Sequence, residues 1–192
     1  SAGATGHLKA PDTRIEEAEP AYDLMMDLPQ LHKLALQRTA MGPKGAGLLA
    51  ETVCGMEGAL RELSVADNPI LGLDETGGGA LDLEGLTNLC QAVGLCRIRV
   101  FDLSACLHCA AAVRVLGDEM SSAEVPLTEL LMDRNLPTDS KPKHGDFRDG
   151  VGLIDVDVSG LALLSRWVGS SATMRSVSLS ACCLGSAALH EL

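Results

Sequence analysis

The sequence predicts an α/β solenoid, with a curved parallel sheet inside and helices and loops outside. Three observations support this fold class. A short leucine-patterned segment recurs along the 192 residues, stretches with helical spacing separate its copies, and only 2% of the residues are aromatic. Small and branched side chains suit thin repeated layers better than one large globular core. With 46% hydrophobic and 21% charged residues, the chain has the composition of a folded, soluble protein.

The recurring segment follows the pattern L-x-x-L-x-L-x-x-N-x-L, in which other apolar residues replace Leu in places and Thr or Cys replaces Asn. A single match would carry little weight because Leu is common, but six matches to one pattern predict a repeat protein. The matching segments are 31–41, 60–70, 98–106, 127–137, 153–163 and 174–184.

Each copy of the pattern predicts a short strand followed by a buried polar position. Alternation places the leucine-type residues of L-x-L on one face of the strand. At the Asn position, a buried side chain can bond backbone groups of the neighbouring copy. Because an unpaired buried backbone group costs roughly 1–3 kcal/mol, a ladder of such residues would stabilise the stack. The ladder residues are Thr39, Asn68, Cys106, Asn135 and Cys182.

The stretches between the copies change to helical spacing, with apolar residues three or four apart. Pro43 and the glycines beside it mark the entry to the first of these helices. Residues 138–149 are polar and broken by Pro and Gly, so we expect a loop there, and 73–83 is an insertion in the second copy. The predicted helices are 43–54, 84–93, 107–116 and a short one at 162–168.

Strand, loop and helix in copies of about 29 residues resemble the ribonuclease-inhibitor class of leucine-rich repeat, over roughly residues 27–192. The resemblance implies a leucine-rich-repeat solenoid of about six repeats. Residues 1–26 are expected to be a flexible N-terminal tail and cap. The last copy starts a helix at 185–192 and stops, so we expect the solenoid to continue beyond residue 192 or a partner to cover this end.

The net charge of −11 argues against nucleic acid as the main ligand, because neutralising phosphates needs clustered Lys and Arg. Basic protein surfaces fit this charge better, although an acidic surface also serves solubility alone. No apolar run reaches the roughly 18–20 residues that a membrane span needs. The seven Cys residues are odd in number and irregularly placed, which predicts reduced thiols in an intracellular, cytoplasmic protein or a cytoskeletal or organelle-matrix assembly.

Three patterns could suggest chemistry, and a structural interpretation is preferred for each. Residues 106–109 resemble part of a zinc site, but closed sites usually need four ligands and Cys106 falls on the ladder. Residues 77–79 lack the Lys-Ser/Thr of a phosphate loop and have acidic neighbours. Asp155 and Asp157 could be paired catalytic carboxylates, but an exposed strand face predicts them equally. We therefore expect no catalytic residue, metal or cofactor.

The x positions of the strands are expected to line the concave face of the sheet. In the second to fifth copies they are mainly acidic with small residues between, which would let a basic partner segment approach closely. The alternative is a face that is only solvated, and the scarcity of aromatic anchors counts against tight binding there. The candidate partner-binding residues are Glu62, Asp67, Asp102, Glu129, Asp133, Asp155 and Asp157.

These observations favour a non-catalytic protein–protein interaction scaffold, either a leucine-rich-repeat subunit of a larger assembly or a regulatory binding module. Its partners would be a protein with a basic surface or segment, or neighbouring subunits of a large complex, with no nucleic acid and no membrane span. Irregular repeat lengths suit the assembly version. The resemblance leaves two alternatives open, a Ran-type small-GTPase-activating protein and the sensor repeats of an intracellular immune receptor.

Overall fold

A computed structural model describes residues 7–9, 31–56, 59–73, 78–122, 124–140 and 154–192, which form an α/β structure. The strands are β1 (His7–Lys9), β2 (Lys33–Ala35), β3 (Glu62–Ser64), β4 (Val100–Asp102), β5 (Glu129–Leu131) and β6 (Ser176–Ser178). The helices are α2 (Pro43–Gly55), α3 (Glu84–Leu95), α4 (Ala110–Ser122), α5 (Ser159–Ser170) and α6 (Ser186–Glu191).

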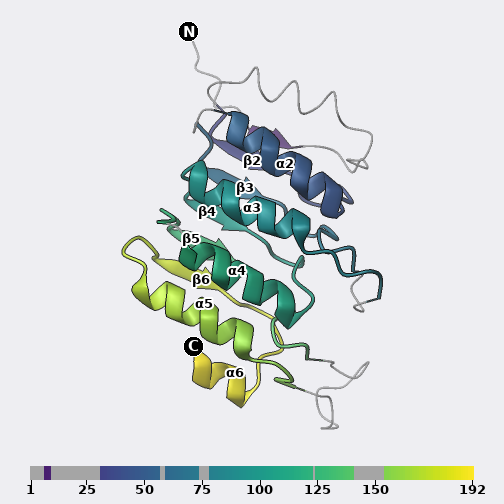
Figure 1. Cartoon of the computed structure of the whole chain (residues 1–192), viewed down its shortest axis with the longest axis vertical. Coiled ribbons are helices and arrows are strands. Elements are labelled where there is room, and N and C mark those ends of the chain that lie inside the picture. Colours follow the sequence, from purple (N-terminus) through teal and green to yellow (C-terminus); the bar gives the residue numbers. More distant parts are fainter. Residues whose placement is uncertain (1–6, 10–30, 57–58, 74–77, 123, 141–153) are drawn as a thin grey trace.

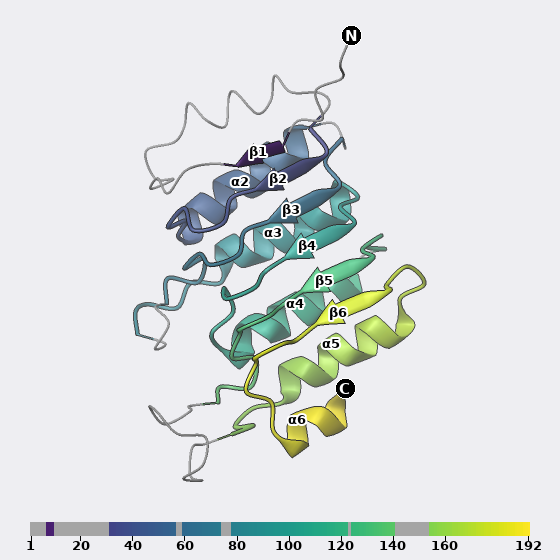
Figure 2. The same cartoon turned by 180° about the vertical axis from the view of Figure 1, so that it is seen from behind.

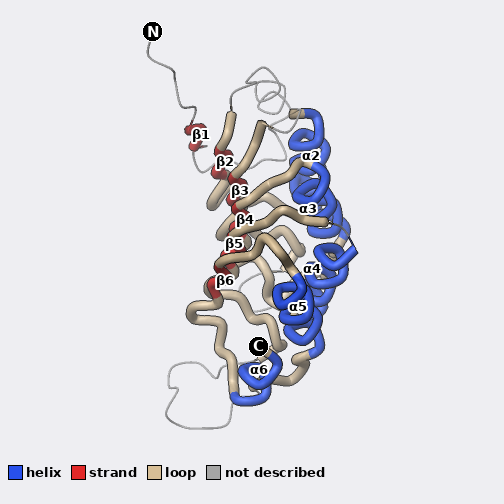
Figure 3. The backbone as a smooth tube through the Cα atoms, turned by 90° about the vertical axis from the view of Figure 1, so that its left-hand side faces the viewer, coloured by secondary structure: helices blue, strands red, loops and turns tan. Residues whose placement is uncertain are grey.

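The strands lie in one sheet in the order in which they occur in the sequence, and each neighbouring pair is parallel. From β2 onward a helix follows each strand, so the chain forms strand–helix units, which we number 1 (β2–α2) to 5 (β6–α6). The helices stack in one layer and the strands in another (Figures 1 and 2). Seen from the side, no described helix covers the second face of the sheet, which we call the open face (Figure 3).

The core lies between the two layers. The central residue of each inner strand points into it, and Leu34, Leu63, Phe101 and Leu130 are at most 1% exposed. The helices contribute apolar stripes, such as Leu86, Leu89, Cys90 and Val93 of α3. Neighbouring helices pack directly on one another, most extensively α2 on α3 and α4 on α5. The apolar residues of each inner unit are thus covered by the units on either side of it, as stacking requires.

The predicted ladder of buried residues is confirmed. Asn68 accepts hydrogen bonds at Oδ1 from the backbone N–H groups of Thr39 (2.9 Å) and Met41 (3.0 Å) in the preceding unit, and its Nδ2 donates to Leu36 O (2.7 Å). Asn135 repeats this geometry two units later, accepting from the backbone N–H groups of Cys106 (2.9 Å) and Leu107 (2.8 Å). The two asparagine side chains therefore bond the backbone of the unit before them.

The residue before each ladder position adopts a left-handed backbone conformation, which residues with a Cβ rarely do. These residues are Arg38, Asp67, Ala105, Arg134 and Ala181, with φ between 53° and 59°. The turn out of each strand is therefore the same in all five units. Three of these residues are charged, and they meet on the open face.

The strand predicted in the segment 153–163 is wrong for the residues described there. Residues 154–158 contain no strand, and β5 pairs directly with β6, with Leu130 opposite Val177. Asp155 has a left-handed backbone conformation (φ 56°), which strand residues do not adopt, and its carboxylate accepts hydrogen bonds from the backbone N–H groups of Gly185 and Ala188. The segment leads into α5, the helix of unit 4, and Ile154 and Val156 are each 55% exposed.

Other boundaries also differ from expectation. Helix α5 has 12 residues instead of one or two turns, and α4 begins three residues later and extends further than predicted. Strand β1 pairs with β2 from within the segment expected to be a flexible tail. The expected loop at 138–149 falls largely outside the described residues. Among the described helices, none combines the length and the apolar character that a membrane crossing requires.

Candidate functional site

The open face carries in-register rows of side chains that run across the sheet. On β2, β3 and β4 the outer residues of each strand are partly exposed on either side of a buried central residue. The residue just before each of strands β2 to β6 extends the rows. For β2 to β5, the backbone carbonyl of this residue accepts hydrogen bonds from the next unit. The sheet therefore presents a regular grid, which is where the sequence placed its candidate residues.

Five of the seven acidic candidates lie on this face. Glu62, Asp102 and Glu129 belong to strands β3, β4 and β5, while Asp67 and Asp133 lie in the turns that follow β3 and β5. These five share one face of the sheet, and their role in binding a partner stays a prediction. Asp155 and Asp157 do not join them, because the strand that would have carried them does not form.

Asp155 and Asp157 instead hold helices together. Asp157 accepts a hydrogen bond from the backbone N–H of Ser159 (2.9 Å) at the start of α5, and it pairs with Arg114 of α4 at 2.6 Å. The hydrogen bond from Ser159 and the nearby Arg114 lower its pKa. Asp155 accepts from the backbone N–H groups of Gly185 (2.9 Å) and Ala188 (3.0 Å) at the start of α6. Both carboxylates are helix-capping groups.

Two acidic residues of the open face are paired with cations. Glu62 lies 2.7 Å from Lys33 Nζ on the neighbouring strand. Asp67 lies between Arg38 of unit 1 (3.3 Å) and Arg134 of unit 4 (2.9 Å). Arg134 reaches across unit 3, where Ala105 occupies the corresponding position. The predicted acidic stripe is therefore partly neutralised by the protein itself.

Asp102 and Asp133 each accept a hydrogen bond from a serine hydroxyl of a neighbouring strand. Asp102 accepts from the Ser64 hydroxyl (2.8 Å) and from the backbone N–H of Ser104 (3.0 Å). Asp133 accepts from the Ser178 hydroxyl and from the backbone N–H of Ser180 (2.8 Å), both in unit 5. The Ser178 hydrogen bond is the main reason that the pKa of Asp133 lies below its ordinary value. These carboxylates are therefore structural links between units.

Glu129 is the acidic candidate that remains available. It is exposed, and its carboxylate makes no hydrogen bond or ion pair with another described residue. It lies beside a row of residues at the position just before each strand, none of which was among the candidate binding residues. This row is His32, Arg61, Arg99, Thr128 and Arg175, joined by backbone hydrogen bonds from each unit to the next.

The arginine row changes the electrostatic character of the open face. Arg99 and Arg175 are exposed and make no ion pair with another described residue. Strands in a sheet lie about 4.8 Å apart, so Arg99 and Arg175 flank Thr128 at roughly 10 Å from each other. The signal was present in the sequence, since Arg occupies the second position of the pattern in three copies. Counting only acidic residues concealed it.

The other sequence patterns do not form sites among the described residues. The Cys106 thiol is fully buried and donates to Val65 O (3.1 Å), and burial raises its pKa to about 12, which opposes metal binding. No group of three or more His, Cys, Asp or Glu residues is arranged around a common point in the described ranges. Residues 77–79 lie partly outside these ranges.

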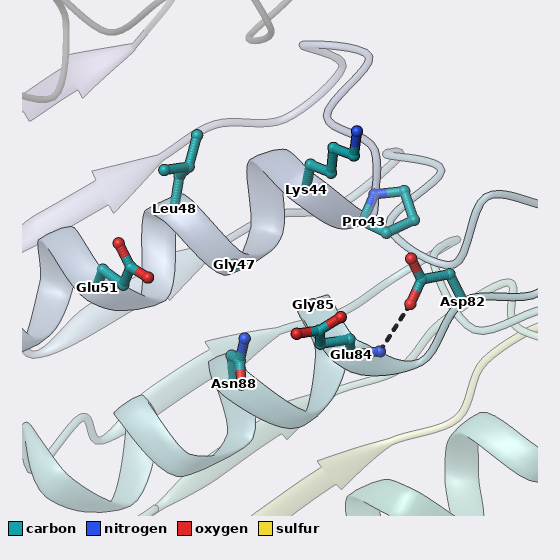
Figure 4. A pocket seen from close by; sticks show the side chains of 9 residues that line it. All are labelled: Pro43, Lys44, Gly47, Leu48, Glu51, Asp82, Glu84, Gly85 and Asn88. Carbon is teal, nitrogen blue, oxygen red and sulfur yellow. Dashed lines mark hydrogen bonds between the residues drawn. The ribbon is translucent and has the colours of Figure 1, made fainter.

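A shallow groove lies on the helical side, between α2 and the start of α3 (Figure 4). Gly85 lets the two helices touch, because a Cβ there would lie 2.2 Å from Pro43 O. Asp82 accepts a hydrogen bond from the backbone N–H of Glu84 (3.0 Å) and so starts α3. The groove is open to solvent, and its charged residues, Lys44, Glu51, Asp82 and Glu84, belong to helix surfaces and caps. We therefore favour the open face as the functional surface.

Comparison with known proteins adds no further constraint on the site. No protein-family model matches the chain, and no curated protein has a similar sequence. What can be concluded about function therefore depends on the residues and their arrangement in the structure.

Proposed function

We propose that this chain is a non-catalytic protein-binding module built as a leucine-rich-repeat solenoid of about six repeats, acting as a subunit of a larger assembly or as a regulatory binder. The repeat interpretation is supported by the ladder of Thr39, Asn68, Cys106, Asn135 and Cys182, which recurs at the same point of all five units. A scaffold role is supported by the open face, which carries exposed, regularly spaced side chains over several strands.

The observation that carries the binding proposal is the cluster of unpaired charges around β5. Glu129 lies on β5, and Arg99 and Arg175 lie at the row position of the strands on either side of it. We propose that a partner polypeptide segment crosses the sheet here. A basic side chain of the partner would face Glu129, and acidic side chains would face the two arginines. The carboxylates of Asp102 and Asp133 would keep this surface in shape through their hydrogen bonds to neighbouring units.

The experiment is capture of partners from the native source, with the tagged protein, mass spectrometry and native sizing. Charge reversal of the proposed surface, with Arg99→Glu, Glu129→Lys and Arg175→Glu together, is expected to lower partner recovery at least tenfold. The matched control reverses exposed charges on the helical side, with Glu51→Lys and Arg166→Glu. Equal recovery from both variants would contradict the placement of the partner, and loss in the control alone would move the interface to the helices.

The same experiment separates the two versions of the proposal. Recovery of a stoichiometric set of many subunits would identify a structural component of an assembly. Recovery of one protein would identify a regulatory binder. The Ran-type activator has less support, because the copies of the pattern are irregular in length. Failure to accelerate GTP hydrolysis by a recovered GTPase would dismiss it. We propose a reducing, cytoplasmic setting on the ground that all seven cysteines are free thiols.

A further inference from the structure

Two cysteines from neighbouring units lie side by side on the helical layer. Cys54 is near the end of α2 and exposed, and Cys96 follows α3 directly and is 6% exposed. The Cys96 thiol donates a hydrogen bond to Cys54 Sγ, with the two sulfur atoms 3.6 Å apart. The residues are 42 apart in the sequence. The contact between the two thiols therefore forms only when units 1 and 2 stack on one another.

We propose that Cys54 and Cys96 form an oxidation site, which hydrogen peroxide converts to a disulfide that joins units 1 and 2. A disulfide needs the sulfur atoms at about 2.05 Å, so the pair must close by roughly 1.5 Å. Rotation of the side chains can supply this, because Cys54 is exposed and lies in the last turn of its helix. The proposal does not depend on the protein-binding function.

The chemistry balances with peroxide as the oxidant. The Cys54 thiolate attacks one peroxide oxygen, the O–O bond breaks, and the released hydroxide takes up a proton to leave as water. Cys54 is then a sulfenic acid. Cys96 Sγ attacks Cys54 Sγ and loses its proton, and the S–O bond breaks with release of a second water. Two thiols and one peroxide thus give one disulfide and two waters.

The different surroundings of the two thiols assign their roles. Solvent reaches Cys54, so the oxidant meets this sulfur first. Burial, and then the hydrogen bond to Cys54, raise the pKa of Cys96, which keeps this thiol protonated and less reactive toward the oxidant. An exposed thiol beside a sheltered one is the arrangement in which a sulfenic acid is resolved within the molecule.

The other cysteines lack such a partner in the described structure. Cys90, Cys106 and Cys182 are buried, and Cys106 and Cys182 donate to backbone carbonyls in the preceding unit, Val65 O and Met132 O. Cys109 and Cys183 are half-buried, and no Sγ–Sγ contact joins either to another described cysteine. Oxidation is therefore expected to select one pair out of the seven cysteines.

The test is peptide mapping of the full chain after brief treatment with hydrogen peroxide, alkylation of the remaining thiols and digestion with trypsin without reduction. Trypsin releases Cys54 in the peptide 45–61 and Cys96 in 62–97. The expected result is a cross-linked 45–61/62–97 species that disappears on reduction. It should be lost in Cys54→Ser and in Cys96→Ser, and retained within twofold in Cys90→Ser, since Cys90 lies in the same peptide.

A second measurement separates the site from a chance cross-link. The oxidised wild-type protein should melt at a higher temperature than the reduced protein, because the disulfide limits the freedom of the unfolded chain. Dithiothreitol should abolish the difference, and Cys96→Ser should show none. The proposal is overturned if a peroxide dose that oxidises Cys54 to sulfinic acid yields no cross-link, or if the cross-link persists in Cys96→Ser and vanishes in Cys90→Ser.

Discussion

Units 3 and 5 follow the same sequence pattern, yet they are buried to different degrees. Phe101, at the centre of β4, is fully buried between β3 and β5, whereas Val177, at the same position of β6, is partly exposed. Helix α4 packs between α3 and α5, whereas α6 packs mainly against α5, with Leu189 62% exposed. The pattern therefore marks residues that can be buried, and the packing of the neighbouring units determines the degree of their burial.

The largest effect is expected when the central strand residue of each unit, Phe101 or Val177, is replaced by alanine. Phe101→Ala should lower the free energy of unfolding by about 3–5 kcal/mol, because it removes a large side chain from a layer closed on both sides. Val177→Ala should cost about 1 kcal/mol, since part of that surface is already in water. Chemical denaturation of both variants measures the difference. Equal losses would mean that the two units are equally well packed.

The ladder offers the second test. Asn68→Ala leaves the buried Thr39 and Met41 N–H groups without their partner, so we expect a loss of about 2–4 kcal/mol. Cys182→Ala removes a thiol that bonds only carbonyl groups, and should cost about 1 kcal/mol. Urea denaturation checks both values. A Cys182 variant as unstable as the Asn68 variant would show that the end unit depends on its ladder residue equally.

Two helix glycines make the third test. A Cβ at Gly85 would collide with Pro43 O, so Gly85→Ala should force α2 and α3 apart and cost about 1–3 kcal/mol. Gly169, in α5, has nothing within 4 Å of the corresponding position. Gly169→Ala should therefore stabilise the protein, by up to about 1 kcal/mol, through helix propensity. Thermal unfolding gives the signs, and stabilisation by Gly85→Ala would disprove the close approach.

The smallest expected effect is the loosening of unit 5 at low pH. The pKa of Asp133 is lower in the folded protein than its ordinary value of 3.8, so its stabilising bonds to unit 5 are present above that pH and are lost as pH falls through the folded pKa. Asp133→Asn should imitate the acid state at neutral pH. Because the carboxylate is largely solvated, we expect only local loosening of β6, seen as faster tryptic cleavage after Arg175. Glu129→Gln serves as the control, and unchanged cleavage in Asp133→Asn would show that this link is dispensable.

Much of the fold could be predicted from the sequence because its signals are local and repeated. Five of the six pattern matches form strands, and the ladder residues are buried as expected. The match at 153–163 failed because alternating apolar residues do not reveal that Asp155 takes a left-handed backbone and bonds the start of α6. Competition between side-chain bonds and a strand is settled by tertiary contacts, which a pattern does not contain.

The site was less predictable for the same reason. The sequence placed five of its seven acidic candidates on the open face, but it did not reveal that Arg134 would reach across unit 3 to Asp67, or that Asp102 and Asp133 would bond serines. Pairing between distant residues depends on register and on small residues such as Ala105. The contact between Cys54 and Cys96 was invisible for similar reasons, since nothing local links positions 42 residues apart.

The direction of the ladder bonds has a consequence for how such a chain can be cut or recombined. Asn68 serves the backbone of unit 1, and Asn135 serves that of unit 3. A segment that contains the hydrogen-bond partners of its own turn is therefore longer than one strand–helix unit. It runs from one strand to the ladder residue of the next unit. A fragment that ends before the following asparagine would be short of acceptors, whereas one that ends after Asn68 keeps the acceptor of the Thr39 and Met41 N–H groups.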